Sequence, residues 1–256
     1  MGSYILCQVR RAENPFFIDS VSLNIYSIEE LCYFICRNLP LLDETVLNES
    51  LAVWLKEELH LRRLSQKLQQ LLKREHSLGD LVLPILREIN YLNNLEFRDL
   101  ESRIRGLEEQ PLPIRLKMKG DALVSHEKYI KAIEAYHSAL VLQKNTSLGS
   151  QFLGTVNNNM GCAYARLFQM DEACECFQKS YEQLHTLPTL KSYLFAVYLK
   201  NGEDAWEKKA DELGVDAATR GEMERQIAAV RQPEKPEDLD RALAEWTRAY
   251  HRNTGL

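Results

Sequence analysis

The amino-acid sequence predicts an all-α protein, with a helical bundle in the first half of the chain and a short run of helical hairpins in the second. Glycine and proline, which interrupt helices, contribute only 11 and 8 of the 256 residues. Apolar residues recur at helical spacing along most of the chain. Beyond residue 110, a set of small and aromatic residues occurs twice with the same offsets. Together these observations favour helices that pack as repeated pairs.

The stretch from Tyr4 to Tyr26 is the least helical part of the sequence. Pro15 disfavours a helix, and apolar and polar residues alternate from Val21 to Tyr26, a pattern typical of a strand. We therefore expect a short strand or an extended arm at the N-terminus. The sequence leaves open whether this arm pairs with another chain.

Five helices are expected between this arm and residue 110. The first begins after Ser27, because Ser27 and Glu30 match a capping box, in which two side chains bond otherwise unpaired backbone N–H groups. Pro40 prevents the chain from continuing that helix. Further caps and leucines at helical spacing predict four more helices, at about residues 48–59, 61–75, 77–91 and 94–109. The predicted N-terminal helical domain therefore covers residues 1–110.

A repeated pattern follows the proline-rich break at residues 110–113. A glycine, an alanine, an aromatic residue and a second small residue occur at offsets of 0, 12, 16 and 19, first as Gly120, Ala132, Tyr136 and Ala139, and again as Gly161, Ala173, Phe177 and Ser180. Small residues are needed where two helices of a hairpin cross closely, and an aromatic ring can fill the wedge between hairpins. The pattern predicts two helical hairpins.

This pattern resembles the tetratricopeptide-repeat (TPR) family over about residues 113–213. The resemblance implies a TPR-like right-handed α-solenoid in a domain of residues 111–214, with a degraded third hairpin from Thr189 to Leu213. Helices expected at 216–231 and 237–252 would then form a C-terminal capping segment, residues 215–256. One departure is the spacing of the two glycines, which is 161 − 120 = 41 residues instead of the usual 34. The N-terminal half also resembles an uncharacterised bacterial family with a stretch similar to residues 26–32, from which no activity follows.

The TPR resemblance also suggests where a partner would bind. In that family the first helices of successive hairpins line a concave groove that takes a peptide or a helix. The positions of this sequence that match the groove are Lys117, Asp121, Val124, Asn158, Cys162 and Arg166. An amide both donates and accepts hydrogen bonds, and a guanidinium matches a carboxylate, so Asn158 and Arg166 suit a peptide. The same residues could instead be ordinary solvated side chains.

No arrangement of residues in the sequence points to catalysis, so we expect no enzyme, no cofactor and no metal site. The histidines lack a second ligand at helical spacing, and a glycine-rich phosphate loop is missing from the sequence. The six cysteines lack the paired spacing of a zinc site and are expected to be reduced, buried thiols. The chain lacks a run of about 18 apolar residues and a signal segment, which predicts a cytoplasmic protein without a membrane anchor.

These features predict an adaptor or scaffold that binds a protein or peptide partner through the groove. The formal net charge of −5 disfavours a nucleic-acid partner. The alternative is a peptide-responsive transcriptional regulator whose N-terminal helices contact DNA, because the region from Lys56 to His76 is rich in basic residues. Its leucine spacing is more typical of a core seam with charges on the solvated face. The partner, the pathway and self-association into a homo-oligomer are left open.

Overall fold

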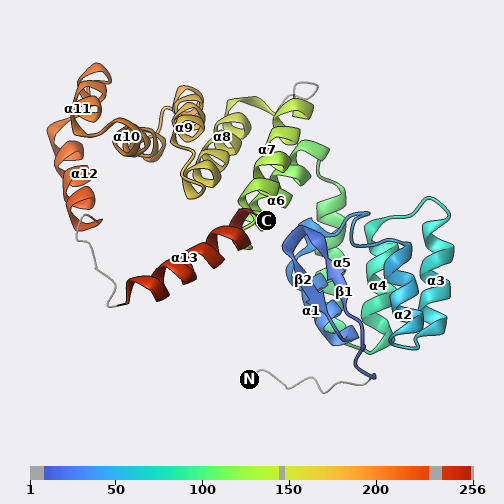
Figure 1. Cartoon of the computed structure of the whole chain (residues 1–256). Coiled ribbons are helices and arrows are strands. Elements are labelled where there is room, and N and C mark those ends of the chain that lie inside the picture. Colours follow the sequence, from blue (N-terminus) through green and yellow to red (C-terminus); the bar gives the residue numbers. More distant parts are fainter. Residues whose placement is uncertain (1–8, 144–147, 231–237, 255–256) are drawn as a thin grey trace. The chain divides into compact units, whose positions relative to one another are not determined.

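A computed structural model describes residues 9–143, 148–230 and 238–254 of the chain. Within these ranges thirteen α-helices account for most residues, and the only sheet has two short strands (Figure 1). The predicted all-α class is confirmed. The chain folds as two compact units, residues 1–126 and 127–256. The domain boundaries expected at residues 110 and 214 remain predictions.

The first unit begins with a β-hairpin. Strands β1 (Phe16–Ile18) and β2 (Leu23–Ile25) pair antiparallel across the short 3₁₀ helix η1 (Asp19–Val21). The expected N-terminal strand is thus present, and its partner is a second strand of the same chain. The Phe16 ring lies 5.8 Å from the Trp54 ring, so the hairpin packs against the helix that carries Trp54.

Five helices, the 3₁₀ helix η2 (Leu39–Leu41) and the first helix beyond the break complete this unit. They are α1 (Ile28–Arg37), α2 (Glu49–Glu57), α3 (Arg62–Leu72), α4 (Leu78–Glu88), α5 (Asn94–Glu108) and α6 (Leu112–Ser125). The expected helices are therefore present, each within a few residues of its predicted ends. Leu64, Leu68 and Leu71 of α3 are buried, as a core seam requires. The Ser65 hydroxyl donates to the Ala52 carbonyl at 2.6 Å and ties α3 to α2.

The cap of α1 differs in one detail from the sequence prediction. Ser27 Oγ accepts from the Glu30 backbone N–H, as expected. The Glu30 carboxylate, however, accepts from the backbone N–H of Tyr26, one residue before the cap. The box at Ser77 and Asp80 of α4 is complete.

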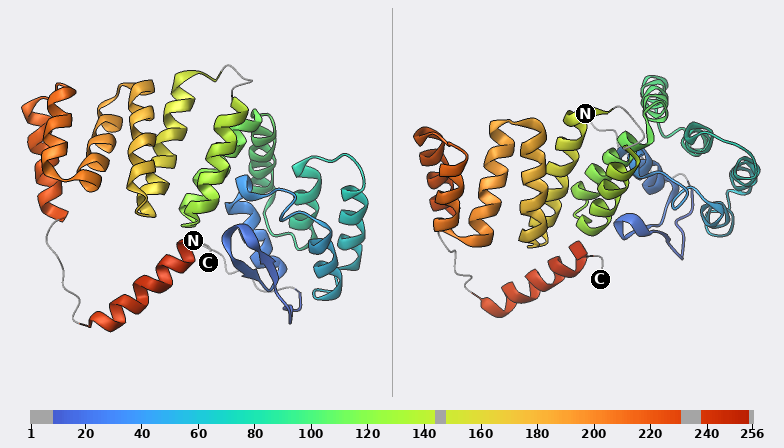
Figure 2. Two further views of the ribbon diagram at one scale, coloured as in Figure 1. Left: turned by 45° about the horizontal axis from the view of Figure 1, so that its top comes forward. Right: turned by 90° about the horizontal axis from the view of Figure 1, so that it is seen from above.

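The second unit is a row of helices. It contains α7 (Tyr129–Gln143), α8 (Gly149–Arg166), α9 (Met170–Leu184), α10 (Leu187–Asn201), α11 (Glu203–Glu212), α12 (Ala217–Val230) and α13 (Leu239–Thr254). From α7 to α11 each helix packs on the next one in the sequence, and Figure 2 shows them side by side. This arrangement of consecutive antiparallel helices is repeat-like. Helix α13 does not continue this order, because its main contact is with α7 and not with the preceding helix α12.

Gly161 of α8 explains why the second copy of the repeated pattern needs a glycine. A Cβ atom built at Gly161 would lie 2.9 Å from Cε1 of the Phe177 ring, closer than real side chains approach. Phe177 in turn belongs to a buried cluster with Ala173 of its own helix and Tyr193 and Ala196 of α10. A single aromatic ring therefore joins α8, α9 and α10. The first copy spans both units, with Gly120 on α6 and the remaining positions on α7, and all four residues are buried.

Helix α12 closes the row through its own cluster. Met223 is fully buried against Leu194 of α10 and against Trp206 and Ala210 of α11. The Lys191 ammonium of α10 and the Glu222 carboxylate of α12 lie 2.7 Å apart. Two helices that are not consecutive, α10 and α12, thus become neighbours.

The close approach at Gly161 predicts opposite effects for two glycine-to-alanine substitutions. Gly161→Ala should lower the free energy of unfolding by about 1–3 kcal/mol, because the added methyl group forces the Phe177 ring to move. Gly221→Ala in α12 adds the same methyl group where nothing lies within 4 Å, and should raise stability by about 0.5–1 kcal/mol through helix propensity. Urea denaturation of both variants measures the difference. Equal stabilisation by the two substitutions would contradict the packing described for Gly161.

Candidate functional site

An apolar groove of the second unit lies between α10 and α12. It has a volume of about 400 Å³, and its lining residues are Phe195, Tyr198, Leu199, Gln226, Ile227 and Val230. Leu199 is 62% exposed and Val230 is 84% exposed, although both side chains are large and apolar. Gln226 provides the only amide among the lining side chains. The groove therefore offers apolar surface, with little capacity to fix a polar ligand.

The groove exists because α10 uses a different face for its core contacts. Leu194 and Tyr193 point into the two buried clusters. Phe195 packs only in part against the second cluster, and Leu199, one helical turn further along, is exposed. The Lys191–Glu222 ion pair holds α12 beside α10. As a result, the C-terminal ends of both helices present apolar side chains next to each other.

Three of the predicted groove residues form a row along α8. Asn158, Cys162 and Arg166 are each four residues apart, which places them on one face of the helix. Arg166 and Cys162 are exposed, and Asn158 is partly buried, with its amide 3.5 Å from the Asn159 side chain. The Arg166 guanidinium is thus accessible to a carboxylate.

The other three predicted residues lie on α6, in the first unit. Lys117 Nζ and Asp121 Oδ2 form an ion pair at 2.6 Å, and Val124 is partly buried. Because the Lys117 and Asp121 charges already satisfy each other, neither presents an uncompensated charge to a ligand. The six predicted residues are therefore grouped as two separate triplets, one on each unit.

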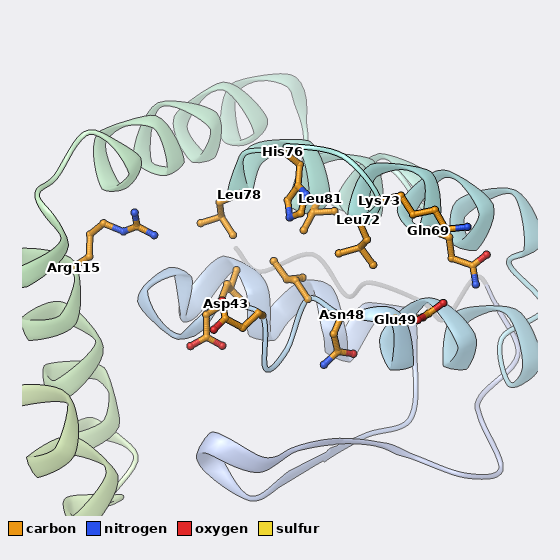
Figure 3. A pocket seen from close by; sticks show the side chains of 13 residues that line it. Asp43, Asn48, Glu49, Gln69, Leu72, Lys73, His76, Leu78, Leu81 and Arg115 are labelled. Atoms are coloured by element: carbon orange, nitrogen blue, oxygen red, sulfur yellow. The ribbon is translucent and has the colours of Figure 1, made fainter. Parts of the chain in front are cut away.

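A larger cleft of about 650 Å³ lies within the first unit (Figure 3). Leucines form much of its lining, and charged side chains of both signs surround them, with Lys73 on one side and Asp43 and Glu49 on the other (Figure 3). Burial opposes ionisation of Asp43, but hydrogen bonds from Lys119 and Thr45 outweigh it and lower the pKa of the carboxyl. Asp43 is therefore charged and already bonded, and the mixed signs around the cleft select no single ligand class.

The cysteines have the environment of inert thiols. No disulfide joins the five described cysteines, and Cys7 lies outside the described residues. Burial raises the pKa of Cys36 and of Cys176 to about 11 and raises that of Cys32 further. The expectation of buried thiols is wrong for Cys162, which is exposed, and Cys36 is only partly buried.

Residues 9–143, 148–230 and 238–254 contain no cluster of three or more His, Cys, Asp or Glu side chains that could hold a metal ion. No helix within the same ranges has both the length and the apolar character required to cross a membrane.

The α10–α12 groove was missed by the sequence analysis. Its lining residues belong to the degraded third hairpin and to a terminal helix, where the repeated pattern gives no register. One available signal was the pair Phe195 and Leu199, two apolar residues on the side of α10 opposite the predicted core positions.

Comparisons with known proteins give no likeness from which a role could be transferred. A scan against protein-family models, a search of curated proteins and a search of solved structures each found no match.

Proposed function

We propose that this protein is a non-enzymatic adaptor or scaffold whose second unit binds a helix of a partner protein. The observation that carries this proposal is the groove between α10 and α12, with Leu199 and Val230 exposed at its edge. An amphipathic helix that lays its apolar face into such a groove removes both surfaces from water. Burial of apolar surface contributes about 25 cal/mol per Å².

The chemistry of the groove selects a helix over an extended peptide. An extended peptide carries unpaired backbone N–H and C=O groups, and these need polar partners in its binding site. The lining of the groove supplies the Gln226 amide and the Tyr198 hydroxyl at most. In a helix the backbone N–H and C=O groups form hydrogen bonds with each other, so its apolar face needs only apolar contacts in the binding site.

The row along α8 supports a contribution from charge. Arg166 is exposed and suits a carboxylate of the partner. The resemblance to the TPR family supports the same mode of binding, since helical repeats commonly present grooves of this kind. Assignment to that family is part of the proposal.

One observation favours the alternative of a DNA-contacting regulator. Every basic side chain predicted for this role is exposed, namely Lys56, Arg62, Arg63, Lys67, Lys73 and Arg74. Acidic neighbours reduce the resulting field, and Lys56 Nζ lies 2.6 Å from the Glu57 carboxylate. We therefore keep this function as the second candidate, with α3 as the contacting helix.

Capture of partners from a lysate of the source cells tests the first candidate. The double variant Leu199→Glu/Val230→Glu should retain its specific partner at least about tenfold less well than wild type, because two carboxylates would be placed in an apolar contact. Both side chains are exposed, so the fold should be preserved, and thermal unfolding verifies this.

Phe168→Glu is the matched control for this capture, because Phe168 is 83% exposed and lies outside the groove. Retention should be unchanged in this control. A partner set that is identical for wild type and for the groove variant would overturn the assignment of the groove.

A titration with labelled duplex DNA separates the two candidates. The adaptor proposal predicts no binding that weakens steeply with salt, because the chain carries a net charge of −5. The regulator predicts such binding, and predicts its loss in the variant Arg62→Glu/Arg63→Glu. Fluorescence anisotropy at several salt concentrations measures this. Salt-sensitive binding that disappears in the variant would favour the regulator.

A further inference from the structure

Helix α13 carries an apolar stripe that the structure leaves exposed. Leu239, Leu243, Trp246 and Tyr250 follow one another at intervals of four, three and four residues, which places them on one face of the helix. Their exposed fractions are 58%, 48%, 57% and 55%. A helix face with four large, half-exposed apolar side chains normally packs against another surface.

The contact of α13 with α7 uses a different side of the helix. Among residues 238–252 only Ala242 and Ala249 are partly buried, and their spacing of seven residues places them on one side. At about 100° per residue, this side lies about a quarter turn from the centre of the stripe. The C-terminal end is also held by Lys128 Nζ, which donates to the Arg252 carbonyl at 3.0 Å. The stripe therefore stays exposed while α13 lies against α7.

The spacing of the stripe is the same in both directions along the helix. Intervals of four, three and four residues are identical when counted from either end. A second copy of α13 that runs antiparallel therefore matches the stripe position by position, with Leu239 opposite Tyr250 and Leu243 opposite Trp246. Each of these contacts pairs a leucine with an aromatic ring and occurs twice about a two-fold axis, as an isologous interface requires.

The charges at the two ends of α13 favour this antiparallel orientation. Asp238 and Asp240 lie at the start of the helix, and Arg248 and Arg252 lie near its end. An antiparallel pair places the acidic start of each copy beside the basic end of the other. A parallel pair would bring like charges together at both ends. A second copy of this helix thus has the complementary charge that the stripe needs in a partner.

A lipid surface suits α13 less well than a second copy does. Helices that lie on membranes commonly carry an excess of lysine and arginine, which anionic lipids attract. In residues 238–254 the three acidic side chains balance the three arginines, so the helix has no net charge with histidine neutral. Arg241 Nε also lies 3.1 Å from the Glu245 carboxylate of the same helix. The charge pattern therefore favours a protein partner.

The exposed area of the stripe suits reversible pairing. A large apolar or aromatic side chain offers about 150–250 Å², so four half-exposed side chains leave on the order of 400 Å² per copy. Two copies would then bury about 800 Å² of apolar surface, which lies in the range of weak, transient complexes. We therefore expect a dissociation constant in the micromolar range.

We propose that α13 is a self-association helix, through which two copies of this chain pair in antiparallel orientation. Leu239 and Leu243 of one copy contact Tyr250 and Trp246 of the other. This surface shares no residue with the α10–α12 groove. The inference therefore goes beyond the proposed function and does not depend on it.

Sedimentation equilibrium of the full-length chain across the micromolar range tests the pairing. The wild type should shift from the monomer mass to twice that mass as its concentration rises. Leu243→Glu/Trp246→Glu should weaken the association at least about tenfold, because it places carboxylates in the apolar contact. Both side chains are exposed, so the fold should be preserved, and thermal unfolding verifies this.

The groove variant Leu199→Glu/Val230→Glu is the matched control and should associate as the wild type does. A wild type that remains monomeric throughout the micromolar range would overturn the inference. Association that persists in Leu243→Glu/Trp246→Glu, or that is lost in the groove variant, would also overturn it. So would binding of the wild-type monomer to phosphatidylserine vesicles that is lost in Leu243→Glu/Trp246→Glu, because the stripe would then serve a lipid surface.

Charge reversal tests the antiparallel orientation. Asp240→Arg alone and Arg248→Asp alone should each weaken the association, because each places like charges beside one another in the antiparallel pair. The double variant Asp240→Arg/Arg248→Asp restores opposite charges and should recover association close to that of the wild type. A double variant that associates no better than the single variants would contradict the antiparallel arrangement.

Discussion

The second unit depends on the contact between the Gly161 backbone and the Phe177 ring. The missing side chain at Gly161 lets the ring lie against α8, and the same ring reaches Tyr193 and Ala196 of α10. One buried aromatic side chain therefore takes part in the packing of three consecutive helices. A larger residue at position 161 would separate α8 from α9 and would also disturb the contact of both helices with α10.

The position of α10 in turn produces the groove. Tyr193 packs toward α9 and Leu194 packs toward α11 and α12, while Phe195 is only partly buried against the second cluster and Leu199 is exposed. In a longer row the next hairpin would cover these two side chains. Here α12 covers them only partly, because Met223 is buried whereas Val230 at the end of the helix is exposed. The binding surface is thus a consequence of how the row ends.

Much of this architecture could be predicted from the sequence because local signals are strong. Caps at Ser27 and Ser77 mark helix starts, and leucine spacing in α3 identifies its buried face. The β-hairpin was only partly predicted, because the alternation that marks β2 is weaker in β1, a strand of three residues. The groove depends on which apolar residues lack a neighbour. The absence of a neighbour depends on tertiary packing, so it could not be predicted from local sequence patterns.

The central claim is that the α10–α12 groove binds an amphipathic helix, and a direct binding titration tests it. The probe is a labelled peptide of residues 238–254, an amphipathic helix with Leu239, Leu243 and Trp246 at the spacing of one face. It is added to the full-length chain that carries Leu243→Glu/Trp246→Glu, so that the peptide does not pair with α13 itself, and fluorescence anisotropy follows the peptide. The account predicts saturable binding, and predicts its loss when Leu199→Glu is added to the same chain. Absence of binding at millimolar concentrations of protein, or binding of equal strength with and without Leu199→Glu, would contradict the account.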